Sequence, residues 1–245
     1  PAARAVQPAP SVSSSGTPTA STAASESTTT PVGGPGLAGP GVLVDRTSGA
    51  PAPPAMAAAS YLVADLDSGA VLVAKEPHAL HLPASTLKTL TALTVMPRLD
   101  PRQVVTAEPS DVVDGSLVGL VPGLTYTVHQ LLQGMMLSSG NDAATALARV
   151  AGGQQGVAGT VAAMQQTAQH LGARDTVVHD PSGLDAPGQV TSAYDLALIA
   201  RAALQDPQLE SLVATKRVRF PGKPVLEGFR SEEHTSELQS PCNLV

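Results

Sequence analysis

The sequence is poor in residue types that mark several classes of protein. Of its 245 residues none is tryptophan, 2% are aromatic and one, Cys242, is a cysteine. No disulfide can therefore form within the chain, and we expect a core of aliphatic side chains. The net charge is −6 and no basic run is present, so nucleic acid is not expected as a partner.

Long apolar runs are also missing. No stretch approaches the roughly 20 consecutive apolar residues of a membrane-spanning helix. The sequence begins at Pro1 without the charged and then apolar pattern of a secretion signal. We expect any signal or membrane anchor to lie upstream of this residue.

The composition changes along the chain and predicts its domains. Residues 1–55 are rich in Pro, Ser, Thr, Ala and Gly, and have too little apolar surface to offset the entropy cost of ordering. We predict a disordered tail or linker there, serving either as a spacer or as an unselected tail. An ordered domain is predicted over 56–229.

Local patterns within this domain predict its elements. Two β-prone runs, Tyr61–Asp65 and Ala70–Ala74, flank a tight-turn signal at Asp67–Gly69 and predict a hairpin. Thr127 has the position of a helix N-cap, and Ser192 with Asp195 forms a predicted capping box. The predicted helices are 83–96, 128–136, 142–150, 159–171, 192–204 and one after Pro207, with short strands at 176–178 and 216–220.

The first predicted helix carries a serine three residues before a lysine. Ser85 and Lys88 therefore lie on one face of the helix and can meet. A serine hydroxyl is a poor nucleophile until an adjacent base activates it, and lysine is a base only when burial or a cationic neighbour keeps it neutral. By itself, the pattern is more typical of an N-terminal serine followed by a solvated lysine.

A second polar group follows on a predicted turn between helices. Ser139 and Asn141 are two residues apart and can point into one cleft, where Ser139 would pass on a proton and Asn141 would bond both substrate and lysine. Serine and asparagine are also common helix caps. His78 and His81 have helical spacing but no further ligand nearby, so we predict loop histidines and no metal site.

Together these motifs resemble the serine-type D-alanyl-D-alanine carboxypeptidases, the low-molecular-mass penicillin-binding proteins, whose general signature combines S-x-x-K, S-D-N and K-T-G. The similar segments are PASTLK at 83–88, SSGNDAA at 138–144, SGLDAPG at 182–188 and SAYDLA at 192–197. The resemblance implies an α+β fold of the penicillin-binding-protein/β-lactamase (DD-peptidase) type, with a helical subdomain and an antiparallel sheet.

The resemblance also implies a mechanism. Ser85 attacks the carbonyl between the two D-alanines of a peptidoglycan stem peptide, Lys88 takes its proton, and Ser139 with Lys88 passes the proton to the departing D-alanine. Ser139 and Asn141 would bind the substrate, and β-lactam antibiotics would acylate Ser85. No cofactor or metal is implied. Because peptidoglycan lies outside the cytoplasmic membrane, an extracytoplasmic location is expected.

The K-T-G motif of the family is absent from this sequence. Neither Lys216 nor Lys223 fits it, and the run Arg230–Ser240 resembles the in-frame translation of a common sequencing-library adapter. We therefore predict that residues 230–245 are an artefact and that the C-terminal part of the catalytic domain is missing. On that prediction the sheet is incomplete and this chain by itself is poorly active.

Three alternatives remain open at this point. A class A β-lactamase needs a glutamate to activate the deacylating water, and no glutamate occurs between Glu108 and Glu210. A DD-endopeptidase cutting D-Ala-containing cross-links would carry the same motifs. An inactive wall-binding relative would keep the fold, although the intact Ser85, Lys88, Ser139 and Asn141 argue against it.

Overall fold

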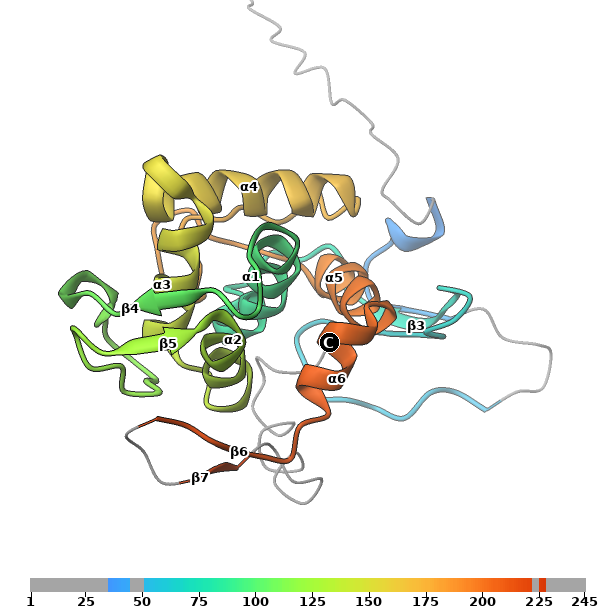
Figure 1. Cartoon of the computed structure of the whole chain (residues 1–245). Coiled ribbons are helices and arrows are strands. Elements are labelled where there is room, and N and C mark those ends of the chain that lie inside the picture. The colour runs from blue at the N-terminus through green and yellow to red at the C-terminus, as the bar shows by residue number, and fades with distance from the viewer. Residues whose placement is uncertain (1–34, 45–50, 222–224, 228–245) are drawn as a thin grey trace, which may run out of the picture.

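The computed structural model describes residues 35–44, 51–221 and 225–227. These residues are arranged around a short central helix (Figure 1). This helix, α1 (Lys88–Val95), contacts four longer helices. The other α-helices are α2 (Val128–Leu137), α3 (Asn141–Ala151), α4 (Gly156–His170), α5 (Ala193–Gln205) and α6 (Pro207–Val213). Single 3₁₀ turns are η1 (Pro35–Leu37), η2 (Ala84–Leu87), η3 (Met96–Arg98), η4 (Pro109–Asp111) and η5 (Gly153–Gln155).

The helices begin where the sequence offers a side chain that can cap them. The Thr127 hydroxyl accepts the Gln130 N–H at 3.2 Å, and the Gln130 side chain accepts the Thr127 N–H at 2.8 Å. This reciprocal pair is the predicted capping of α2. At α5 only half of the predicted capping box forms, because the Asp195 carboxylate accepts a hydrogen bond from Thr176 instead.

Three small antiparallel sheets accompany the helices in the described part of the chain. The predicted hairpin is confirmed as β2 (Tyr61–Ala64) and β3 (Val71–Lys75), with β1 (Val42–Leu43) on the other edge of β3. The other pairs are β4 (Val104–Thr106) with β5 (Thr125–Thr127), and β6 (Arg217–Arg219) with β7 (Val225–Glu227). The predicted strand at 176–178 is wrong, because only Val177 forms a bridge, to Val190.

Strand β1 corrects part of the prediction of a disordered tail over 1–55. Residues 35–44 are ordered because β1 supplies backbone partners to β3 and the Glu76 carboxylate accepts the Gly41 N–H at 2.6 Å. Leu37 adds an apolar contact with the cluster under the hairpin. Residues 1–34 and 45–50 of the predicted tail, and the predicted artefact at 230–245, lie outside the described residues.

The core is aliphatic, as the shortage of aromatic residues predicts. The largest buried cluster fills the space between α1, α2, α3 and α6, and a second lies between α1, α4 and α5. Tyr126 and Phe220 make the one large aromatic contact of the first cluster, with ring centroids 5.4 Å apart. In the described residues, no helix has the length and apolar character needed to cross a bilayer. Helix α1 therefore packs between the two clusters, and this packing fixes the positions of its residues.

Candidate active site

Ser85 lies on a tight turn at the start of the central helix. The predicted helix over 83–96 is divided, since Ser85 belongs to the 3₁₀ turn η2 and only Lys88 begins α1. Leu87 and Lys88 have ψ values of −23° and −24°, which are typical of 3₁₀ geometry. Side chains at i and i+3 eclipse one another in such a turn. The hydroxyl of Ser85 is therefore brought directly over the amine of Lys88.

The Lys88 ammonium has three hydrogen-bond partners from three parts of the chain. Its Nζ lies 2.9 Å from Ser85 Oγ, 2.7 Å from Asn141 Oδ1 and 2.7 Å from the backbone carbonyl oxygen of Ser182. The lysine is 2% exposed, whereas Ser85 is exposed to solvent. A molecule in solution can therefore reach the hydroxyl while the amine stays covered.

Burial lowers the pKa of Lys88 from its ordinary value to about 8. The negative charges of Asp180 and Asp142 oppose this shift, because they favour the ammonium form. With a pKa near 8, about one tenth of the lysine is neutral at neutral pH, compared with about one in three thousand for an exposed lysine. The amine is thus available as a base under ordinary conditions.

The Asn141 amide is fixed in one orientation. Its Oδ1 accepts from Lys88, and its Nδ2 donates to the backbone carbonyl of Asp114 at 2.8 Å. Rotating the amide by half a turn would place two donors together and two acceptors together. The backbone N–H of Asn141 also donates to the carbonyl of Ser116 at 2.7 Å. The loop over 114–116 therefore holds the side chain that holds the lysine.

Ser139 occupies a backbone conformation that serine rarely adopts. Its φ is +53°, and it follows the end of α2 in a turn closed by the Gly140 N–H on the carbonyl of Gly134. Such a conformation costs on the order of 1 kcal/mol in a residue with a Cβ. Within the described residues its half-buried hydroxyl makes no hydrogen bond to Lys88. Its role in proton transfer stays a prediction.

The loop after α4 supplies a partner that the sequence did not reveal. The Ser182 carbonyl accepts from Lys88, and the Pro181 carbonyl accepts from the Thr91 hydroxyl at 2.6 Å. Lys88 and Thr91 are one turn apart on α1, so they bind two consecutive carbonyls. The run Asp180–Gly183 predicts a turn, but no feature of the local sequence predicts that this turn contacts α1.

Gly183 lets this loop approach the serine turn. Its φ is +84°, and a Cβ built on it would lie 1.8 Å from the carbonyl oxygen of Ala84. Ala84 itself has a φ of +47°. Two unusual backbone conformations therefore meet beside Ser85, and only glycine fits at 183.

Asp142 fixes the loop over 118–120 beside the site. Its buried carboxylate accepts four backbone N–H groups at 2.7 to 3.0 Å, from Val118, Gly119, Leu120 and Ala143. Three of these belong to the loop that also contacts Asn141. In the sequence, Asp142 stands out only as part of the segment at 138–144, because loop packing brings the four donors to its carboxylate.

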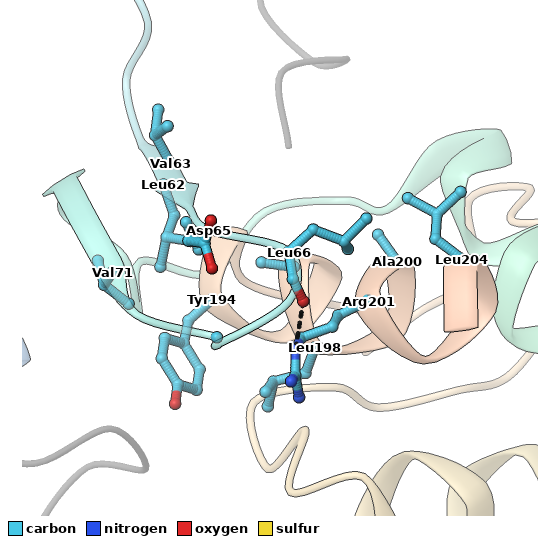
Figure 2. Close-up of a pocket in the computed structure, with 13 residues that line it drawn as sticks. Leu62, Val63, Asp65, Leu66, Val71, Tyr194, Leu198, Ala200, Arg201 and Leu204 are labelled. Carbon is cyan, nitrogen blue, oxygen red and sulfur yellow. Dashed lines mark hydrogen bonds between the residues drawn. The ribbon is translucent and has the colours of Figure 1, made fainter.

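A separate apolar pocket lies between the β2–β3 turn and α5. It has a volume of about 380 Å³ and is lined by residues such as Leu62, Leu66 and Leu198. Figure 2 shows Arg201 at its rim, donating from Nε to the Leu66 carbonyl at 2.9 Å. None of the four predicted site residues lines this pocket.

The two loop histidines make structural contacts. His78 Nδ1 lies 2.7 Å from Asp175 Oδ2, and its ring lies 4.8 Å from that of Tyr194. His81 exchanges backbone hydrogen bonds with Thr191. Within the described residues, no group of three His, Cys, Asp or Glu side chains is arranged to hold a metal ion.

Comparison with known proteins relates this arrangement to one family. The sequence pattern of the family described as D-alanyl-D-alanine carboxypeptidase matches residues 47–228. The D-alanyl-D-alanine carboxypeptidase DacB2 of Mycobacterium tuberculosis is 44% identical over 167 residues, which cover 67% of this chain and 56% of that protein. The chain spans about half the length of the curated relatives it matches.

Solved structures share the fold. The crystal structure of D-alanyl-D-alanine carboxypeptidase from Mycobacterium tuberculosis H37Rv matches with a TM-score of 0.70 at 39% identity, covering 75% of this chain and 70% of that one. Penicillin binding protein 6B from Escherichia coli matches with a TM-score of 0.69 at 31% identity, covering 76% and 62%. The α+β fold predicted from the sequence is therefore confirmed.

Proposed function

The chain belongs to the D-alanyl-D-alanine carboxypeptidase family, and from this premise we propose that it carries the acylating centre of a serine D-alanyl-D-alanine carboxypeptidase. The substrate would be a peptidoglycan stem peptide ending in D-Ala-D-Ala. The observation that carries the proposal is an exposed serine hydroxyl 2.9 Å from a buried lysine whose pKa is lowered to about 8. Few structural roles need a lysine that is both buried and easily deprotonated.

The hydrogen bonds of Lys88 explain why the neutral amine acts on Ser85. A neutral amine has two protons and one lone pair. The Asn141 Oδ1 and the Ser182 carbonyl are acceptors only, so they take the two protons. The lone pair is then directed at the third partner, the Ser85 hydroxyl, which must donate. Deprotonation of Lys88 thus converts Ser85 Oγ from an acceptor into a donor and a nucleophile.

The reaction then follows in two balanced halves. Ser85 Oγ bonds to the carbonyl carbon of the penultimate D-alanine as its proton moves to Lys88 Nζ. The C–N bond breaks, the proton passes to the leaving amine, and free D-alanine departs. Water then attacks the ester carbon as Lys88 accepts a proton from it, and the bond between that carbon and Ser85 Oγ breaks. Oγ takes the proton back from Lys88, and the shortened peptide leaves with a free carboxyl group.

Ser139 and Asn141 complete the proposed site. Asn141 would hydrogen-bond the substrate amide in addition to Lys88. Ser139, whose hydroxyl has no bond to Lys88 among the described residues, would relay the proton between Lys88 and the departing amine. Its backbone strain fits a residue held in place for function. β-Lactams, whose strained amide has the same reacting atoms, would acylate Ser85 and act as inhibitors.

The substrate sets the proposed location and partners. Peptidoglycan lies outside the cytoplasmic membrane, so we propose an extracytoplasmic protein, in the periplasm, in the cell wall or secreted. Its partners would be stem peptides and β-lactams, and its part in the cell would be peptidoglycan maturation.

Release of D-alanine tests the proposal directly. The protein is incubated with a synthetic peptide ending in D-Ala-D-Ala, with the same peptide ending in D-Ala-L-Ala as the matched control. We expect the terminal alanine to be released only from the first peptide, and slowly, because the K-T-G motif is absent from this sequence. We also expect a penicillin adduct that mass spectrometry of peptides places on Ser85. If neither released D-alanine nor an adduct on Ser85 is found, the proposal is overturned. Loss of the penicillin adduct within seconds would favour a β-lactamase instead.

The rate of acylation by a fluorescent penicillin should rise with pH, with a midpoint near 8. The reactive form is the neutral amine, and the pKa of Lys88 is lowered to about 8. Lysine is therefore mostly protonated and inactive below this pH, and mostly neutral above it. Each unit of pH below the midpoint should reduce the rate about tenfold.

This profile is measured by stopping the labelling reaction at timed intervals across the pH range. Circular dichroism at each pH serves as the control for unfolding. A rate that stays flat through pH 8, or one that falls as the pH rises, would contradict Lys88 as the base.

A further inference from the structure

The carboxylate of Asp180 organises the loop that reaches Lys88. A single oxygen, Oδ1, accepts the Ser182 N–H at 2.7 Å, the Ser182 hydroxyl at 2.5 Å and the Leu184 N–H at 3.1 Å. These are the local bonds by which an aspartate closes a turn on the backbone that follows it. The second oxygen, Oδ2, makes no hydrogen bond among the described residues.

The turn determines where the Ser182 carbonyl points. Both the N–H and the hydroxyl of Ser182 are held by Asp180, so the remaining polar group, the carbonyl, faces Lys88 at 2.7 Å. Gln189 steadies the start of the turn, since its Oε1 accepts the N–H groups of His179 and Asp180 at 3.0 and 2.8 Å. The carbonyl is therefore fixed before any substrate arrives.

We propose that Asp180 is a positioning residue for proton transfer from Ser85 to Lys88. Its carboxylate shapes the turn that keeps the Ser182 carbonyl on one N–H of the lysine, and this contact turns the lone pair of the neutral amine towards the serine hydroxyl. The inference rests on the proposed function, because it assigns Asp180 a part in the same acylation step.

The charge of Asp180 has a second effect that opposes the first. Two carboxylates act on Lys88 through their charge, Asp180 from the loop and Asp142 from α3, and both raise its pKa against the larger effect of burial. The groups that are hydrogen-bonded to the amine are neutral. They are the Ser85 hydroxyl, the Asn141 amide and the Ser182 carbonyl. Asp180 therefore improves the geometry of the transfer while keeping a larger share of the lysine protonated.

Two substitutions separate these effects. Asp180→Asn keeps an oxygen at the position of Oδ1 and removes the charge, whereas Asp180→Ala removes both the turn and the charge. Asp185→Asn is the matched control, because it removes one charge from an exposed carboxylate of the same loop. The acylation rate by a fluorescent penicillin is measured against pH for all four proteins. The Lys88 pKa is measured independently by NMR of carbon-13-labelled lysine, in a chain that has only four lysines.

We expect Asp180→Asn to lower the pKa of Lys88 and to move the pH profile to lower pH, with a plateau rate close to that of the wild type. Each unit of that displacement would make acylation about tenfold faster on the acid side of the profile. Asp180→Ala should lower the plateau by about 10- to 100-fold at every pH, because the carbonyl no longer directs the amine. Asp185→Asn should leave both the pKa and the profile unchanged.

The inference and the proposed function can fail separately. If the wild type is acylated but Asp180→Ala reaches the same plateau, the inference is overturned and the proposed function stands. Equal losses in Asp180→Asn and Asp180→Ala, with the Lys88 pKa unmoved, would also overturn it. A wild type that is never acylated overturns the proposed function, and the inference with it.

Discussion

Replacing Ser85 with alanine is expected to abolish covalent labelling by a fluorescent penicillin, and D-alanine release with it. The substitution removes the only hydroxyl hydrogen-bonded to Lys88 in the described part of the chain. Loss of the nucleophile in serine hydrolases reduces turnover by about 10⁴-fold or more. Because Ser85 is exposed on its turn, the fold should tolerate the change. Gel fluorescence and intact-protein mass spectrometry measure the outcome.

Ser110→Ala is the matched control for this experiment. Ser110 is also exposed and lies in a 3₁₀ turn, η4, but it contacts Glu108 and not the lysine. The Ser110→Ala variant should be labelled at the wild-type rate. Labelling of Ser85→Ala at an undiminished rate would show that the nucleophile lies elsewhere, and would remove the basis for the assignment of Lys88.

Gly183→Ala is expected to slow acylation by more than about 10²-fold and to lower the thermal unfolding temperature. A Cβ at 183 would lie 1.8 Å from the Ala84 carbonyl oxygen and 2.5 Å from its carbon. The backbone on one side must therefore move, and Ser85 follows Ala84 directly. A displacement of about 1 Å at reacting groups can cost a factor of about 10² in rate.

Gly188→Ala separates this contact from backbone strain. Gly188 has the same φ of +84° in the same loop, but a Cβ there meets only the His179 side chain, at 3.3 Å. Both variants should lose about 1–2 kcal/mol from the left-handed conformation, and only Gly183→Ala should lose acylation. Equal acylation rates in the two variants would show that the close approach to Ala84 does not position the serine.

The unusual backbone conformations of the molecule gather near this site. Three described non-glycine residues have a positive φ, and two of them are Ala84, which precedes Ser85, and Ser139. Each stores on the order of 1 kcal/mol, which the surrounding contacts must offset. Surrounding contacts, such as the close approach of Gly183 to Ala84, must therefore hold these turns against their local preference.

The sequence predicted those features that depend on neighbours a few residues apart. The hairpin, the start of α2 at Thr127 and the meeting of Ser85 with Lys88 follow from turn chemistry, capping and helical spacing. Their interactions close within the element itself, so the local pattern is sufficient. The family followed from four short segments, and the comparisons confirm it.

The sequence missed features that depend on where elements lie in space. Strand β1 was predicted as part of a tail, because only the edge of β3 and the Glu76 carboxylate order it. The predicted strand at 176–178 lacked a neighbour beyond a single bridge. At Ser192 the predicted capping box was incomplete, since Thr176 offered Asp195 a hydrogen bond from another segment.

The active-site lysine shows the division most clearly. The sequence by itself determined that Ser85 and Lys88 would meet, because they are one turn apart. Only the tertiary structure decided that the pKa of Lys88 would be lowered, since its burial, the Asn141 amide 53 positions away and the Ser182 carbonyl 94 positions away come from packing α1 against α3 and a distant loop. A pKa depends on all the charges and dipoles around a group, and these are fixed only when the chain has folded.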